Sequence, residues 1–98
     1  MPLDATGLPP SIQLEGVRFA MKNGEAIVPV FVTAEALQDW PGAPVDYGAA
    51  FELCRSAAED LASDLFDQAS GKIAVPIVID SRALNPGVWN YPSPTRYR

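Results

Sequence analysis

The fold is decided by residues 16–32, which have the sequence GVRFAMKNGEAIVPVFV. In its first half, apolar side chains alternate with others, which is the period of a strand that buries one face. The apolar members of this alternation are Val17, Phe19 and Met21. The second half is again rich in β-branched residues, which favour strands. The stretch therefore predicts two neighbouring strands, Gly16–Met21 and Ala26–Val32.

The turn between these strands is predicted at Asn23-Gly24, because both residues tolerate the positive φ angles of a type I′ turn. A two-residue loop at this position fixes the register of the two strands. The expected cross-strand pairs are Met21 with Ala26, Phe19 with Val28, and Val17 with Val30. Apolar side chains would then meet on one face, which favours an antiparallel hairpin.

A short helix is predicted directly after the hairpin. Thr33 is a suitable N-cap residue, and Glu35 in the first turn complements the dipole of the helix. The helix is expected to end at about Trp40, because Pro41-Gly42 follows and interrupts the helical hydrogen bonds.

A longer helix is predicted from Asp46, its N-cap residue, to about Ser70, with Gly71 as the residue that ends it. Apolar residues recur along it at helical spacing and form one stripe, which indicates a face that packs on a sheet. The stripe consists of Tyr47, Ala50, Phe51, Cys54, Ala57, Ala58, Leu61, Leu65 and Ala69.

A third strand is predicted at Ile73–Ile79, which is apolar on both faces. Pro29 and Pro76 lie inside the second and third strands, and proline belongs on edge strands because it cannot donate to a ladder. We therefore expect the first strand at the centre of a three-stranded, mainly antiparallel sheet, with the helices on one face. This arrangement is an α+β domain of two layers with the order ββααβ.

The length of 98 residues fits a single domain. We expect this domain at residues 12–85, between a flexible lead-in at 1–11 and a tail rich in proline and aromatic residues at 86–98. The net charge of -5 disfavours binding to nucleic acids and to anionic membranes. Residues 1–10 lack the basic start and apolar core of a signal peptide, so a cytoplasmic location is expected.

The sequence offers few groups for catalysis, because it contains no histidine and a single cysteine, Cys54. Cys54 lies on the apolar stripe of the long helix and is expected to be buried and inert. Asp80-Ser81-Arg82 is interpreted as a polar turn at which one helical turn begins.

The acidic residues Glu59, Asp60 and Asp64 are interpreted as a solvated helix face. Arg55 and Glu59 are four residues apart and are expected to form a surface ion pair. We therefore predict no catalytic, cofactor-binding or metal-binding residues, and a protein that is not an enzyme.

Several short motifs occur in a fixed order along the chain. They are Val17-Arg18-Phe19, Val32 to Leu37, the helical residues Phe51, Arg55, Glu59 and Ala62, and finally Ser81 to Leu84. Together they resemble the family of short bacterial proteins known as domain of unknown function 1488, over about residues 12–85. The resemblance implies the ββααβ architecture and supplies no reaction, because the members of the family are uncharacterised.

The C-terminal tail combines aromatic and basic side chains. They are Trp89, Tyr91, Arg96, Tyr97 and Arg98. Such a tail can stack on single-stranded bases, dock on a partner or fold back over the sheet. The acidic body of the chain argues against the nucleic-acid interpretation.

With the helices on one face of the sheet, the hairpin would present one arginine and four apolar residues on the other. They are Arg18, Ala20, Ile27, Pro29 and Phe31. Because exposed apolar patches mark interaction sites, we predict a small non-enzymatic interaction or regulatory domain that self-associates as a symmetric homodimer and has a protein partner of unknown identity. The candidate interaction residues are Arg18, Ile27, Phe31, Trp89 and Tyr91. The alternatives are a single-stranded nucleic-acid binder that uses the tail, and a carboxylate- or metal-dependent enzyme.

Overall fold

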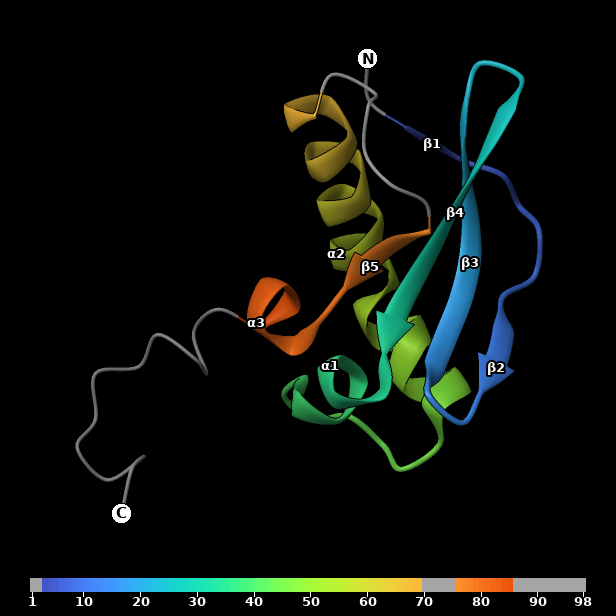
Figure 1. Ribbon diagram of the computed structural model, residues 1–98. Helices are drawn as coiled ribbons and strands as arrows, with labels where there is room; N and C mark the ends of the chain where they lie inside the picture. Colours follow the sequence, from blue (N-terminus) through green and yellow to red (C-terminus); the bar gives the residue numbers. More distant parts are fainter. Residues whose placement is uncertain (1–2, 70–75, 86–98) are drawn as a thin grey trace.

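Figure 1 shows a computed structural model of the chain, which describes residues 3–69 and 76–85. The helices of this part lie on one side of a twisted sheet, so the predicted α+β class is confirmed. The elements are β1 (Asp4–Ala5), β2 (Ser11–Gln13), β3 (Gly16–Asn23), β4 (Ala26–Thr33), α1 (Ala34–Asp39), α2 (Tyr47–Gln68), β5 (Ile77–Ile79) and α3 (Ser81–Leu84). None of the helices in the described residues has the length and apolar character needed to cross a lipid bilayer.

The sheet differs from the predicted three-stranded one, because it has five strands and is mixed. The strand order is β1-β3-β4-β5, and β2 also pairs with β3. The pair β3–β4 is the expected antiparallel hairpin, whereas β5 pairs with β4 in parallel. The two additional strands come from the segment before the hairpin and pair with β3 in antiparallel fashion.

The prediction that the first strand of the hairpin lies between the other two is wrong, because β5 pairs with β4 and not with β3. The proline argument fails for a physical reason. Pro29 lies one residue before Val30, where the ladder with β5 begins, and Pro76 lies directly before Ile77. Neither proline has to donate a hydrogen bond within that ladder, so an interior strand accommodates Pro29.

The hairpin turn is formed by Gly24-Glu25 rather than by Asn23-Gly24, so the predicted register is wrong by two residues. Asn23 pairs with Ala26, and the observed apolar pairs are Met21 with Val28, Phe19 with Val30, and Val17 with Val32. Gly24 supplies the positive φ of the turn, 63°. Asn23 is therefore not needed in the turn and belongs to the ladder. A shift of two residues keeps each side chain on its face, so the predicted buried face is still right.

The core lies between the sheet and the helices. β3, β4 and β5 bury every second side chain, as the alternating pattern predicts. The ring of Phe51 on α2 packs against that of Phe19 on β3, with their centroids 5.0 Å apart. Of the expected stripe on α2, Ala50, Phe51, Cys54 and Ala58 are buried, whereas Leu61 and Leu65 are partly buried at the margin of the core.

A glycine is required at the start of β3. Gly16 has a φ of 150°, and a Cβ atom at this position would lie 2.0 Å from the carbonyl oxygen of Val32. The backbone carbonyl of the neighbouring Glu15 accepts a hydrogen bond of 2.7 Å from the backbone N–H of Ala34, the first residue of α1. The close backbone approach therefore ties the β2–β3 turn to the start of the helical layer.

The sequence predicts a flexible lead-in at residues 1–11, but residues 3–5 pack on the domain. The side chain of Leu3 is buried in the core, and its backbone N–H donates a hydrogen bond of 2.9 Å to Ser63 Oγ on α2. Asp4–Ala5 pairs with Met21 and Lys22 of β3. Two or three residues of strand are too short to produce a recognisable alternation in the sequence.

The helix boundaries follow the expected caps in part. Thr33 is the N-cap of α1, and its Oγ1 accepts a hydrogen bond of 3.2 Å from the N–H of Ala36. Asp46 precedes α2 but makes no side-chain capping hydrogen bond. The predicted end of this helix at Ser70 and Gly71, and the part of the third strand at Ile73–Val75, lie outside the described residues.

Candidate interaction surface

The side of the sheet opposite the helices, here called the open face, is built by the alternation of β3, β4 and β5. Side chains that alternate with the buried ones point to this side. They are Arg18, Ala20 and Lys22 on β3, Ile27, Pro29 and Phe31 on β4, and Val78 on β5. The register places Phe31 between Arg18 and Val78, and Ile27 beside Lys22.

The centre of the open face is apolar. Ile27 and Val78 expose 56% and 55% of their surfaces, and Pro29 and Phe31 are half-buried between them. The apolar surface continues across two strands, because Phe31 and Val78 are register partners. Contiguous apolar surface of this kind is the usual mark of a contact with another molecule.

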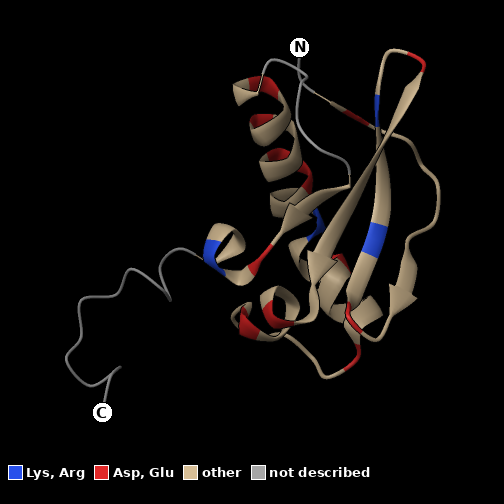
Figure 2. Cartoon of the chain, viewed as in Figure 1, with Lys and Arg blue, Asp and Glu red and all other residues tan. Residues whose placement is uncertain are grey.

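The charges on this side are few and of both signs. Arg18 and Lys22 lie on β3, and Asp4 on β1 is the register partner of Lys22. Figure 2 shows the opposite distribution along α2, where acidic residues follow one another down the helix. The open face therefore differs in both charge and polarity from the acidic surface of α2 on the other side of the sheet.

The structure brings together three of the five candidate interaction residues. Arg18 and Phe31 are direct register partners, and Ile27 lies on the same strand and face as Phe31. Trp89 and Tyr91 lie outside the described residues. An interaction role for all five residues stays a prediction.

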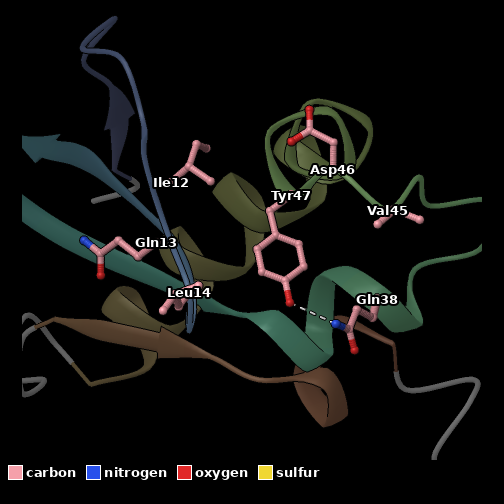
Figure 3. A pocket seen from close by; sticks show the side chains of 7 residues that line it. All are labelled: Ile12, Gln13, Leu14, Gln38, Val45, Asp46 and Tyr47. Atoms are coloured by element: carbon pink, nitrogen blue, oxygen red, sulfur yellow. Dashed lines mark hydrogen bonds between the residues drawn. The ribbon is translucent and has the colours of Figure 1, made fainter.

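A second surface feature was not predicted from the sequence. A groove of about 590 Å³ opens at the end of the molecule where β2, α1 and the start of α2 meet (Figure 3). Its lining residues are Ile12, Gln13, Leu14, Gln38, Val45, Asp46 and Tyr47. Gln38 Nε2 donates a hydrogen bond of 2.9 Å to the hydroxyl of Tyr47 on one side of it (Figure 3). The available signal was two apolar residues, Leu14 and Val45, in segments without any periodicity.

The single thiol lies inside the core, as predicted. Cys54 is fully buried on α2, and desolvation raises the pKa of its thiol above the ordinary value of 9.0. A raised pKa disfavours the thiolate, which is the reactive form. The geometry therefore favours a packing role for this side chain.

The predicted ion pair on α2 is confirmed. Arg55 Nε donates to Glu59 Oε2 at 3.2 Å, and Arg55 Nη1 lies 3.5 Å from Glu52 Oε2. The guanidinium also lies 5.6 Å from the centroid of the Phe51 ring. Within the described residues, no three His, Cys, Asp or Glu side chains converge as a metal site would require.

The Asp80-Ser81-Arg82 segment forms the polar turn that the sequence suggests. Asp80 Oδ1 accepts a hydrogen bond of 2.9 Å from the N–H of Ala83 and so caps α3. The buried Ser81 hydroxyl donates to Asp39 Oδ2 at the end of α1. Asn85 Nδ2 donates to the carbonyl of Ala36 at 3.0 Å and to Ser81 Oγ at 3.3 Å. This network anchors α3 on α1.

The family of the chain follows from a comparison with family models. The model described as Protein of unknown function (DUF1488) matches residues 12–79, so the chain belongs to this family. The match covers the sheet from β2 to β5 together with α1 and α2, and it stops before the predicted motif at Ser81 to Leu84. No curated protein and no solved structure matches the chain.

Proposed function

We propose that this domain is a small protein-interaction module that self-associates through its open face as a symmetric dimer. The observation that carries the proposal is the apolar patch of Ile27, Phe31 and Val78 on the side of the sheet opposite the helices. Covering this patch removes apolar surface from water, which is the main driving force of association.

A second copy of the chain is a suitable cover because the open face carries charges of both signs. The described part of this face has two basic residues, Arg18 and Lys22, and one acidic residue, Asp4. Two copies therefore do not meet as large surfaces of like charge. A two-fold interface uses the same patch on both subunits, and two-fold dimers are the commonest oligomers. Within the described residues, β5 is a short edge strand that pairs in parallel, so it offers less backbone for open-ended pairing than a long edge.

A binding role rather than a catalytic one is supported by how the polar groups are used. Asp80 caps α3, Ser81 and Asn85 hold α3 on α1, and Arg55 pairs with Glu59. Each group already has a structural partner, which leaves it less free to act on a substrate. We also propose a regulatory role and a cytoplasmic location for the protein.

Sedimentation equilibrium on three chains tests the dimer. The full chain is expected to be dimeric, and the double variant Ile27→Ser/Val78→Ser is expected to be monomeric. Leu53→Ser is the matched control, because Leu53 exposes 56% of its surface, as Ile27 does, but lies on α2. A double variant that dimerises as strongly as the full chain would contradict the proposal.

The tail is tested as a competing cover by a chain that ends at Asn85. If the full chain is monomeric and the shortened chain associates, the tail covers the open face and the proposed dimer is wrong. If both chains are dimeric with similar affinity, the tail has no part in the interface.

A further inference from the structure

The groove at the end of the molecule is separate from the open face. Ile12 is the register partner of the buried Val17, so this edge of the groove belongs to the helix side of the sheet. The opposite wall comes from Gln38 on α1 and from Val45 to Tyr47 at the start of α2 (Figure 3). A ligand of the groove would therefore leave the open face free.

The rim of the groove is unusually apolar for a loop region. Leu14 exposes 92% of its surface and Val45 exposes 96%. These side chains gain nothing from the core of their own domain, so a contact that covers both would be favourable. The volume of about 590 Å³ lies within the range of binding pockets.

The backbone beside the groove can accept another strand. Among the described residues, β2 pairs with β3 and with no other strand, so β2 has a free edge. The three consecutive residues Ile12–Leu14 line the groove, which brings main-chain groups as well as side chains to its border. An extended peptide that adds to such an edge obtains main-chain hydrogen bonds, and adjacent pockets select its side chains.

The residues around the groove are acidic and therefore favour a positively charged ligand. Asp46 lines the groove and makes no side-chain capping bond and no ion pair within the described residues. Glu15 follows Leu14 directly, and Figure 2 shows acidic residues on α1 and on the chain that leads to α2. None of the Lys and Arg residues in the described part of the chain lines the groove.

We propose that the groove binds an extended peptide segment of a partner protein whose side chains on the groove side are apolar, with one Lys or Arg among them. The segment adds as a strand beside β2, and its apolar side chains pack between Leu14 and Val45. A Lys or Arg of the segment pairs with Asp46. The Gln38–Tyr47 hydrogen bond fixes the two polar side chains at the wall against which the peptide lies.

Fluorescence anisotropy with a labelled synthetic peptide of the pattern Val-Ser-Lys-Ser-Val, which places Val and Lys on the same face of a strand, tests the proposal on the full chain. Saturable binding at one peptide per chain is expected. Val45→Ser is expected to weaken binding about tenfold and Asp46→Asn about threefold, because they remove an apolar contact and an exposed ion pair. The same peptide with Glu in place of Lys is expected not to bind.

The controls separate this site from general attraction to an acidic protein. Asp60→Asn removes one exposed charge from α2, far along the helix from Asp46, and is expected to leave binding unchanged. Equal weakening by Asp60→Asn and Asp46→Asn, or no saturable binding to the full chain, overturns the proposal. The Ile27→Ser/Val78→Ser variant is expected to bind the peptide normally, so failure of the dimer and failure of this site are distinguishable.

Discussion

The two faces of the sheet come from the same strands and behave in opposite ways. On the helix side, the β4 residues Val28, Val30 and Val32 are buried under α1 and α2. On the other side, Ile27 and Phe31 of the same strand remain accessible. Both sets are apolar, so hydrophobicity alone does not decide which residues form the core. The position of the helical layer decides it, and this leaves a second apolar surface with no partner in the described residues.

The strongest test of this difference compares two phenylalanines. Phe51→Ala should reduce the free energy of unfolding by about 3–5 kcal/mol, because it removes a fully buried ring that packs on Phe19. Phe31→Ala on the open face should cost much less, because its ring already faces solvent in part. Urea denaturation of both variants at low protein concentration measures the difference. Equal losses would mean that the open face is as tightly packed as the core.

The second-largest loss of stability is expected from a substitution that strains the backbone. Gly16→Ala should cost about 3 kcal/mol, because a Cβ atom there collides with the carbonyl of Val32 and the φ of 150° is strained for any side chain. Gly24→Ala is the matched control, since the turn has open space and only the positive φ is unfavourable. It should cost about 1 kcal/mol. Similar midpoints of thermal unfolding for the two variants would show that Gly16 is not under steric constraint.

The attachment of α3 to the helical layer gives a smaller effect. Asn85→Ala should cost about 1–3 kcal/mol, because it removes the buried amide that donates to the carbonyl of Ala36. Gln68→Ala, at an exposed position near the end of α2, should be close to neutral. In Asn85→Ala, the rate of backbone amide hydrogen exchange should rise in Ser81–Leu84. Unchanged protection there would argue that Asn85 does not hold α3.

The part of the fold that could be predicted is the part with a clear period. The alternation in β3 and β4 identified the buried face, and the stripe on α2 identified Phe51 and Cys54 as core residues. The same alternation placed Arg18, Ile27 and Phe31 on one surface. These predictions succeed because side-chain direction depends only on local backbone geometry.

The features that escaped prediction depend on contacts between distant segments. β1 and β2 are strands because β3 offers them a partner, and their own sequence is too short to specify this. The pairing of β5 with β4 follows from the path of the chain through α1 and α2. The groove joins residues from three separate segments, Ile12–Leu14, Gln38 and Val45–Tyr47, so no spacing in the sequence indicates it.

Burial of the Cys54 thiol on the helix side of the sheet makes the stability of the fold depend on pH. Desolvation raises the pKa of Cys54 in the folded chain above 9.0, so the folded state holds this proton more tightly than the unfolded state. The stabilisation that results is complete below the unfolded pKa and is lost as pH rises through the folded pKa. The difference in unfolding free energy between the full chain and Cys54→Ala should therefore shrink at alkaline pH. A constant difference from neutral pH to about pH 10 would contradict a buried thiol.

The smallest expected effect concerns the open face of a single chain. Ile27→Ser should change the stability of the monomer by about 0.5 kcal/mol or less, because more than half of this side chain is already exposed. If a second copy covers the face, the same substitution should become costly as protein concentration rises, since association stabilises only the folded chain that can dimerise. The melting temperature of the full chain should then increase with concentration, and that of Ile27→Ser should increase less. Parallel curves for the two chains would mean that the apolar residues of the open face remain in water, and that the contrast between the two faces is one of burial alone.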